Sequence, residues 1–415
     1  MTGMRAMTTL GTALTLVHTG QAPTRSALTA ALGVSRATAG AVVTELRDLG
    51  LIQVDSVTHG GAAHGGAAHT GTAHAGTQGR PSHRLEISSG GPVALAAQLH
   101  PDGFAVALVG LGGRIVARAS SHGPVPGDPG EALDLVAGAC AELLGGSGLT
   151  CAGAALAVPA AVTEPDGAAV SPLYLDWPTG TPISALFAGR LLGHGVGGPG
   201  TTVTGRAVND VNARALAEHR HGAGRGAAYL LVVAAEHRGV GGALVLRGDL
   251  YTGSTGLSME VGHVSVDPNG RPCPCGNRGC LNVETDAERF MTLAGRVPDS
   301  GSAVLDQAVS VLRAEYGRDE RVTAAAGALI GHLGLGLADL INVINPDRVL
   351  LGGLHGHLLL AAPDQLRQAV ALRSPWGRGA GVPIHPCALD HGSLIGAAEL
   401  AWQPILDDPA ILRRY

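Results

Sequence analysis

Lysine is missing from this sequence of 415 residues, so all 28 of its Lys and Arg positions are arginine. Without lysine the chain cannot form a Schiff base or carry a phosphate-binding loop that ends in Gly-Lys-Ser/Thr. Aromatic residues make up only 3% of the chain and charged residues 15%, whereas glycine occurs 64 times. We therefore expect cores of small aliphatic side chains and many loops whose backbone conformation depends on glycine.

Long apolar runs are also missing. No run reaches the roughly 18 residues that a membrane helix needs, and the N-terminus lacks a basic stretch followed by an apolar segment. We therefore expect a cytoplasmic protein that does not span a membrane. The net charge of −5 excludes nucleic-acid binding through bulk charge, so any DNA contact must be local. A hydrophobic content of 45% and this length predict a globular chain of two or three domains.

The N-terminal residues predict a compact unit of three helices. Thr24 and Ser35 are each placed to cap a helix, and Gly33 between them allows a tight turn, which is the spacing of a helix-turn-helix. The second of these helices directs a small polar surface away from the core, formed by Arg36, Thr38, Gly40, Thr44 and Arg47. Such a surface suits phosphates and base edges in a major groove. A helical bundle without a DNA role would show the same spacing.

A hairpin beside these helices is predicted from residues 51–54 and their return at 84–87. The segment between them, 56–79, is a low-complexity tract of Gly, Ala and Thr in which histidine recurs every five residues, at His59, His64, His69 and His74. We interpret it as a disordered wing tip or linker, with metal capture as the alternative. Arg80, next to Pro81, suits either a minor-groove contact or a plain linker.

From about residue 93 strands alternate with helices, which predicts an α/β architecture. The first strands form a hairpin, 104–109 and 114–118, around a Gly112-Gly113 turn. The glycine-rich stretch 189–205 is a candidate boundary between two lobes with a ligand cleft between them. We predict domains at residues 1–87, 88–205 and 206–415.

The strongest local signal is a group of three cysteines, Cys273, Cys275 and Cys280, that follows His263. Gly276 and the residues around it allow the turns that bring three sulfurs and an imidazole around one tetrahedral ion. Because disulfides are rare in the cytosol, we interpret residues 260–284 as a loop that holds a structural zinc ion.

Several motifs over residues 93–400 together resemble the ROK family of sugar kinases and sugar-responsive repressors. The motifs are Ser258–His263 with the cysteine group, Val208–Asn212, Gly239–Gly242, Trp177 after Ser171-Pro172, Asn342–Pro346 and Leu351–Gly353. A helix-turn-helix in front of such a domain is similar to the family's repressor branch, which includes xylose and N-acetylglucosamine repressors. The resemblance implies an N-terminal winged helix-turn-helix followed by an α/β two-lobed, actin-like ATPase (sugar kinase-like) domain.

The resemblance also implies a sugar site. It assigns sugar-hydroxyl contacts to Asn209, Asp210, Glu260 and His263, with His263 also on zinc, and in the family's kinases the Asp at position 210 is the catalytic base. Amide and carboxylate groups are well suited to paired hydroxyls. Without the resemblance, Asn209-Asp210 would also be explained as the start of a helix.

Two departures from the family pattern bear on function. The Asp-x-Gly-x-Thr turn that holds Mg²⁺ and the triphosphate is replaced by Gln98-Leu-His100-Pro101-Asp102, where Gln98 is neutral and Pro101 offers no amide proton. A sugar-contacting Glu is replaced by Asn282, with Glu284 as a possible substitute.

We therefore expect a non-enzymatic transcriptional regulator that binds double-stranded operator DNA and a sugar or sugar derivative, as a homodimer or dimer of dimers. Ser35, Arg36, Thr38, Thr44 and Arg80 would form the DNA contacts. A sugar kinase that kept its helix-turn-helix is the competing hypothesis. The residues do not distinguish repression from activation.

Overall fold

The computed structural model describes residues 7–55, 83–170, 172, 174–197, 205–236, 239–301, 303–375 and 381–414. The chain divides into two compact units. One unit consists of Met1–Pro92 together with Gln403–Tyr415, and the other of Val93–Trp402. The His-rich tract and Arg80 lie outside the described residues.

The smaller unit contains three helices and a hairpin, as the sequence predicted. Its elements are α1 (Thr9–His18), α2 (Arg25–Leu32), α3 (Arg36–Asp48), β1 (Ile52–Asp55) and β2 (Arg84–Ile87). The Thr24 side chain accepts from Ala27 N–H and the Ser35 side chain from Thr38 N–H, so both expected caps are present. Gly33 ends α2 in the left-handed conformation, with φ 65°. β1 and β2 pair antiparallel, which confirms the hairpin.

The C-terminal end of the chain also belongs to the smaller unit, which corrects the expectation that residues 206–415 form one lobe. It consists of the last turn of α14 (Gly392–Asp407) and the 3₁₀ helix η4 (Pro409–Arg414). The N–H and hydroxyl of Thr8 both donate to the Asp407 carbonyl, at 3.3 Å. Gly11 is needed because a Cβ there would lie 2.4 Å from the Leu406 carbonyl oxygen. Pairing between residues about 400 positions apart in the chain cannot be deduced from local patterns.

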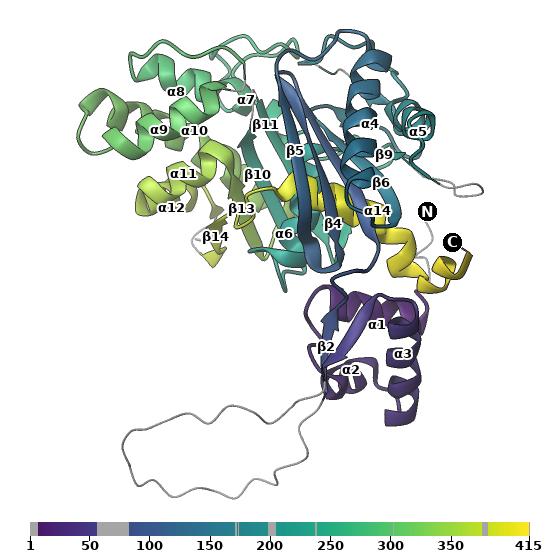
Figure 1. The fold of residues 1–415 in the computed structure, drawn as a ribbon. Helices are drawn as coiled ribbons and strands as arrows, with labels where there is room; N and C mark the ends of the chain where they lie inside the picture. The colour runs from purple at the N-terminus through teal and green to yellow at the C-terminus, as the bar shows by residue number, and fades with distance from the viewer. Residues whose placement is uncertain are drawn as a thin grey trace, which may run out of the picture. The chain divides into compact units, whose positions relative to one another are not determined.

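The larger unit contains two five-stranded sheets, which confirms the α/β architecture (Figure 1). The first sheet has the order β5-β4-β3-β6-β9. Its strands are β3 (Val93–His100), β4 (Gly103–Gly110), β5 (Arg114–His122), β6 (Cys151–Val158) and β9 (Gly205–Asn209). The helices α4 (Pro129–Gly145) and α5 (Ile183–Gly193) pack on it. The short elements around it are η1 (Leu111–Gly113), β7 (Ala161–Val162) and β8 (Ala169–Val170).

The second sheet, of order β12-β11-β10-β13-β14, repeats the topology of the first. In both sheets, counting strands in chain order, a three-stranded antiparallel meander is followed by two parallel strands added beside its first strand. The strands are β10 (Tyr229–Glu236), β11 (Gly239–Leu246), β12 (Asp249–Leu250), β13 (Arg348–Gly352) and β14 (Ile384–Pro386). The turn between the first two strands is therefore equivalent in the two sheets.

The helices that connect the last three strands of the second sheet gather beside it in Figure 1. They are α8 (Ala287–Leu293), α9 (Ala303–Glu315), α10 (Glu320–Ile344), α11 (Gly353–Ala361) and α12 (Pro363–Ala371), preceded by η2 (Val261–His263) and α7 (Leu281–Glu284). By length and composition alone α10 could cross a membrane, but 56% of its most apolar stretch is buried inside the protein. Its buried residues belong to the core of this lobe. We therefore interpret α10 as a core helix.

In the larger unit, α6 (Asp210–His221) packs against the part of α14 that precedes Gln403. They touch directly, because a Cβ at Gly396 of α14 would lie 1.7 Å from the Ala213 carbonyl oxygen of α6. The carboxylate of Glu399 in α14 is buried and contacts two side chains of α6. It lies 2.7 Å from the Arg220 guanidinium and 2.8 Å from the His221 imidazole. These contacts fix α14 to the helix that begins at Asp210.

Candidate functional site: a polar cavity beside a cysteine cluster

A cavity of about 410 Å³ lies where the first sheet, the second sheet and the cysteine loop meet in the larger unit. We call it the effector cavity. Five of the six sugar-contact residues expected from the sequence line it, namely Asn209, Asp210, Glu260, His263 and Asn282. It is also lined by Pro101, Tyr174, Glu236 and Cys275. The structure therefore brings together residues that are separated by up to 181 positions in the sequence, from Pro101 to Asn282.

The start of α6 supplies two of these groups. Asn209 caps the helix, because its side-chain oxygen accepts from Val211 N–H at 2.9 Å and from Asn212 N–H at 3.1 Å. Its amide nitrogen donates to the Ala160 carbonyl at 3.2 Å. Both acceptor positions and one donor are thus occupied, and a single N–H remains for a ligand. Asn209 is both the helix cap and a cavity residue.

Asp210 is a buried carboxylate whose charge is costly. Burial and the nearby carboxylate of Glu236 raise its pKa to about 7, although the Val211 N–H and the Arg214 guanidinium act in the opposite direction. Glu236 in turn pairs with Arg214, with 2.5 Å between Oε1 and Nε. Asp210 therefore changes protonation near neutral pH, and a donor that hydrogen-bonds to it favours its charged form.

Asn282 and Glu284, the two candidates for one role, lie in different places. Asn282 lines the cavity, where its oxygen accepts from Val240 N–H at 2.7 Å and its nitrogen donates to the Tyr174 hydroxyl at 3.2 Å. Glu284 does not line the cavity. It is buried, accepts from Arg271 N–H at 2.7 Å and pairs with Arg289 at 3.4 Å. Glu284 therefore braces the cysteine loop and leaves the cavity position to Asn282.

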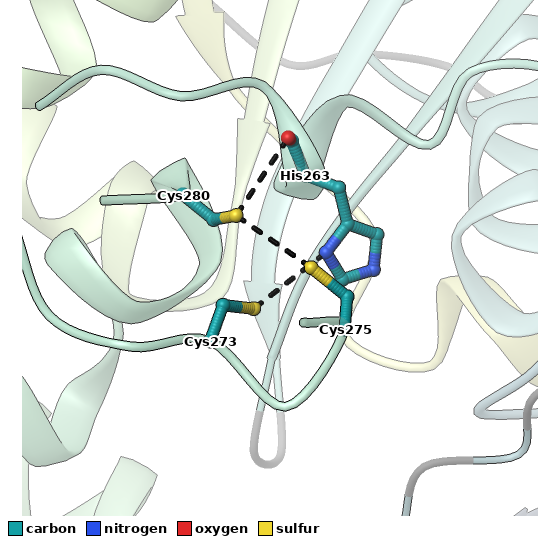
Figure 2. A group of neighbouring side chains, drawn as sticks. All are labelled: His263, Cys273, Cys275 and Cys280. Carbon is teal, nitrogen blue, oxygen red and sulfur yellow. Dashed lines mark hydrogen bonds between the residues drawn. The ribbon is translucent and has the colours of Figure 1, made fainter. Parts of the chain in front are cut away.

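The cysteine loop gathers the four expected metal ligands, as Figure 2 shows. One ligand atom from each of His263, Cys273, Cys275 and Cys280 lies within 4.8 Å of all the others. The Sγ atoms of Cys275 and Cys280 are 3.7 Å apart, and Cys273 Sγ is 3.8 Å from His263 Nδ1. A tetrahedral ion with Zn–S bonds of about 2.3 Å places its ligand atoms about 3.7 Å apart. The spacing therefore fits zinc.

The thiols of the cluster would release protons on binding a cation. Burial, together with the neighbouring thiols, raises the pKa of Cys280 to about 12, so a bound cation is needed to hold it as a thiolate at neutral pH. The turn is tight: a Cβ at Gly279 would lie 1.5 Å from the Asp267 carbonyl oxygen. His263 directs Nδ1 toward the sulfurs, while its Nε2 lies 4.0 Å from the half-exposed Glu260 carboxylate. The imidazole thus joins the cluster to the cavity wall.

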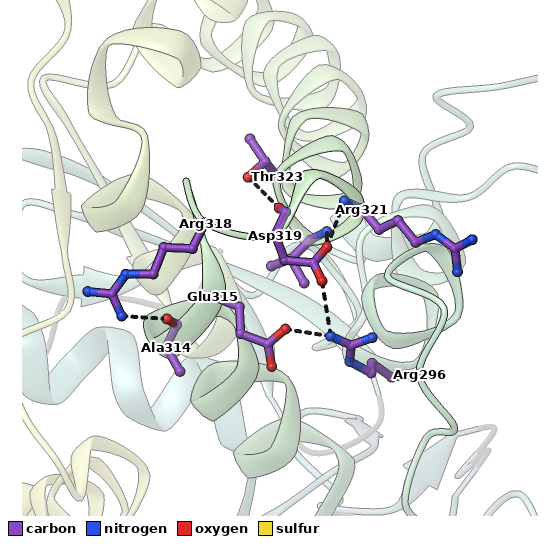
Figure 3. Close-up of polar contacts among 8 residues, drawn as sticks. Arg296, Ala314, Glu315, Arg318, Asp319, Arg321 and Thr323 are labelled. Carbon is purple, nitrogen blue, oxygen red and sulfur yellow. Dashed lines mark hydrogen bonds and ion pairs between the residues drawn. The ribbon is translucent and has the colours of Figure 1, made fainter.

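A polar network away from the cavity holds the helix behind the cysteine loop. Arg296 contacts Glu315 at 2.5 Å and Asp319 at 3.3 Å, joining the segments around α9 and the start of α10 (Figure 3). Asp319 caps α10 by accepting from Arg321 and Val322 N–H, and these N–H groups lower its pKa. α10 then packs on the loop, since Gly336 approaches the Leu281 side chain. We assign this network a structural role.

A second cavity, of about 530 Å³, shares the wall residue Glu236 with the first. Gln98 and His100, at the end of β3, line it, whereas Pro101 lines the effector cavity. It is also lined by Arg214, Gly352 and Gly353. The sequence missed Glu236, Arg214 and Tyr174. Glu236 was detectable as a carboxylate at the end of a buried strand, a common ligand-site position in α/β proteins.

In the smaller unit, four of the expected DNA contacts lie on α3 or cap it. Arg36, Thr38 and Thr44 are exposed on the helix. The Ser35 hydroxyl caps the helix by accepting from Thr38 N–H, and it also lies 2.9 Å from the Thr38 hydroxyl. The structure therefore places these four groups on one helix, and Arg80 stays a prediction.

Comparison with known proteins identifies the larger unit. The model of the ROK family matches residues 101–403. The chain belongs to the ROK family. This chain is 28% identical to the DNA-binding transcriptional dual regulator NagC of Escherichia coli over 207 residues. The aligned residues cover 48% of this chain and 50% of NagC. The chain is also 28% identical over 328 residues to a glucokinase of Thermotoga maritima, or 74% of this chain and 92% of the kinase. The alignment thus spans about half of the regulator's length.

Solved structures show the same fold. A ROK family transcriptional regulator, a homologue of the E. coli MLC protein, superposes with a TM-score of 0.71 at 19% identity, covering 98% of this chain and 97% of that one. A Streptomyces griseus ROK glucokinase solved with glucose and AMPPNP superposes with a TM-score of 0.62 at 22% identity, covering 75% of this chain and 99% of that one. The two matches differ in how much of this chain they include.

Proposed function

We propose that this ROK protein is a cytoplasmic, sugar-responsive transcriptional regulator, most simply a repressor, and not an enzyme. The coverage of the structural matches carries the proposal. A ROK regulator matches 98% of the chain, whereas the glucokinase leaves about a quarter of it unmatched. The smaller unit accounts for that difference in length and has the three helices and hairpin of a winged helix-turn-helix.

The effector cavity supports a sugar or sugar derivative as ligand. Asp210 and Glu260 offer carboxylate acceptors, Asn209 retains one N–H, and His263 is oriented by the cysteine cluster. Acceptors and donors that converge on one space suit vicinal hydroxyl groups, each of which both donates and accepts. Asn282 then helps to decide which sugar fits, because a neutral amide stands where many relatives are expected to have a carboxylate.

Zinc in this proposal has a structural role. The three thiolates and the imidazole would complete its tetrahedral shell, and four protein ligands leave no position for a reacting water. Bound zinc would hold the loop compact and fix the orientation of His263 at the cavity wall. It would also displace the protons of the buried thiols.

The second cavity argues against phosphoryl transfer. Gln98 and His100 stand where a kinase needs a metal-binding carboxylate and a phosphate-binding turn. Glu236 lies on the wall that both cavities share, and its carboxylate is paired with Arg214. Asp210 is in this view a former catalytic base that now binds ligand.

DNA binding is proposed for α3, with Arg36, Thr38 and Thr44 reaching the major groove and Ser35 holding the start of the helix. Arg80 is retained as a minor-groove contact. One module with so few arginines binds weakly, so we expect a dimer, or a dimer of dimers, on an inverted repeat. A bound sugar can shift DNA affinity only by its own differential affinity for two arrangements of the protein.

An electrophoretic mobility shift with DNA from upstream of the protein's own gene, repeated across a sugar panel, tests the proposal. We expect a shift that one sugar changes. Arg36→Ala should remove the shift and leave sugar binding intact, and Asp210→Asn should do the reverse. Arg367→Gln, at an exposed ion pair on α12, is the matched control. A protein that shifts no DNA but releases ADP with a sugar and ATP would be a kinase, as the glucokinase relative allows.

A further inference from the structure

The outward face of α3 is a shallow groove between two arginines. Its floor is formed by small side chains on successive turns, Ala37, Ala41 and Thr44, all of which are exposed. Arg25 and Arg413 line the same groove. Small side chains on the outermost face of a helix allow close approach by another molecule, and the flanking guanidinium groups favour an anionic one.

Arg25 lies across α3 near its first turn. A Cβ at Gly40 would be 2.2 Å from Arg25 Nη2, so glycine makes room for the guanidinium. The same nitrogen donates to the Arg36 carbonyl at 3.4 Å. Arg25 begins α2 and its own backbone N–H is bound to the His83 carbonyl, at the base of the hairpin. This arginine is therefore held in place from the side of the helix-turn-helix itself.

Arg413 comes from the other end of the chain. It lies in η4, which begins two residues after Asp407, the last residue of α14, whose carbonyl accepts hydrogen bonds from Thr8 beside α1. Its Nη2 contacts the Glu45 carboxylate of α3 at 2.5 Å, and 62% of the Arg413 side chain is exposed. A guanidinium has five N–H donors in a fork, so several donors face solvent after one contact with Glu45.

We propose that Arg413 binds a phosphate of the DNA backbone beside α3, so that the C-terminal end of the chain completes the DNA-binding surface. The inference rests on the proposed function and adds a residue to it. Glu45 and Asp48 place two carboxylates on α3, and both would repel phosphates. Arg413 neutralises Glu45, is oriented by it, and directs its remaining donors along the groove. Exposed guanidinium forks are typical phosphate ligands.

Salt-dependent binding of the full-length protein to duplex DNA tests this inference. The probe is a fluorescein-labelled, mixed-sequence duplex, because phosphate contacts do not depend on sequence. Arg413→Gln should lower affinity about eightfold at 0.1 M salt and make the slope of log affinity against log salt shallower by about 0.9, the effect of one lost phosphate contact. Arg367→Gln on α12, an arginine of similar exposure, should change neither quantity. Thermal unfolding of each variant verifies that it folds.

A double variant separates phosphate binding from charge balance. If Arg413 only masks Glu45, then Glu45→Gln/Arg413→Gln should bind as tightly as the wild-type protein. If Arg413 contacts phosphate, the double variant should stay about eightfold weaker than Glu45→Gln alone, with the shallower slope. Full recovery in the double variant, or an unchanged slope for Arg413→Gln, overturns the inference while wild-type DNA binding stands. A wild-type protein that binds no duplex overturns the proposed function, and this inference with it.

Discussion

The two cavities of the larger unit share the wall residue Glu236 but differ in what the rest of their walls offer. The effector cavity gathers side-chain donors and acceptors from α6, η2 and α7. The second cavity is lined by Gln98 and His100, and it contains the Arg214–Glu236 ion pair. The sheets behind both have the same strand order. The difference between the cavities therefore lies in their lining residues, and in the proposed function only the effector cavity binds a ligand.

We expect the largest effect on binding from a substitution in the cysteine loop, because this loop lines the effector cavity and not the second cavity. Cys280→Ser should lower the affinity for zinc at least about 100-fold, because it removes one of four ligands. Sugar binding should be lost with the zinc. Metal content of the purified protein and calorimetry with the sugar identified by the mobility shift measure the two effects.

Cys387→Ser is the control for that variant, because Cys387 lines the second cavity. It should keep about one zinc per chain and the wild-type sugar affinity. Loss of zinc in this variant as well would contradict the assignment of the four ligands.

Asp210→Asn should weaken sugar binding about 10- to 100-fold. It replaces a charged acceptor with a neutral one, and a hydrogen bond to a charged group contributes about 1.5–3 kcal/mol. The matched variant is Asp390→Asn in the second cavity, for which calorimetry should find unchanged affinity. Equal losses in both variants would mean that the sugar is not bound at Asp210.

Sugar affinity should also depend on pH because the pKa of Asp210 is about 7 in the free protein. A hydroxyl donor needs the charged carboxylate, so affinity should fall up to about tenfold per pH unit below this pKa and level off above it. Glu236→Gln removes a nearby negative charge and should move the midpoint to lower pH. A midpoint unmoved in this variant would contradict the coupling between the two carboxylates.

The smallest expected effect is that of Mg-ATP on the second cavity. Added nucleotide should leave the unfolding temperature unchanged, and no ADP should form with any sugar. Turnover of even about 1 s⁻¹, near the lower end for kinases, would place the chain with the family's enzymes.

Local signals in the sequence predicted much of this structure. The caps at Thr24 and Ser35, the hairpin beside α3 and the four ligands of the cysteine loop depend on residues close together in the chain, where spacing limits geometry. Long-range contacts were not predictable in this way. Arg413 meets Glu45 across 368 positions, and no local pattern marks either residue.

Within the site, the contacts of two side chains decided what the sequence left open. Asn282 and Glu284 are two residues apart on α7 and were equal candidates, but only Asn282 lines the cavity. Glu284 is turned toward Arg271 and Arg289 instead. Two residues are about half a helical turn apart, so these side chains lie on opposite faces of α7, and sequence spacing alone does not indicate which face of so short a helix meets the cavity.

The close contact between Gly396 and Ala213 limits how α6 can move. A carbonyl oxygen of α6 occupies the space of any side chain at position 396, and Glu399 ties the far end of the same helix to α14. Glycine at position 396 is therefore a packing requirement, because any larger residue there would push α14 away from the helix that begins at Asp210.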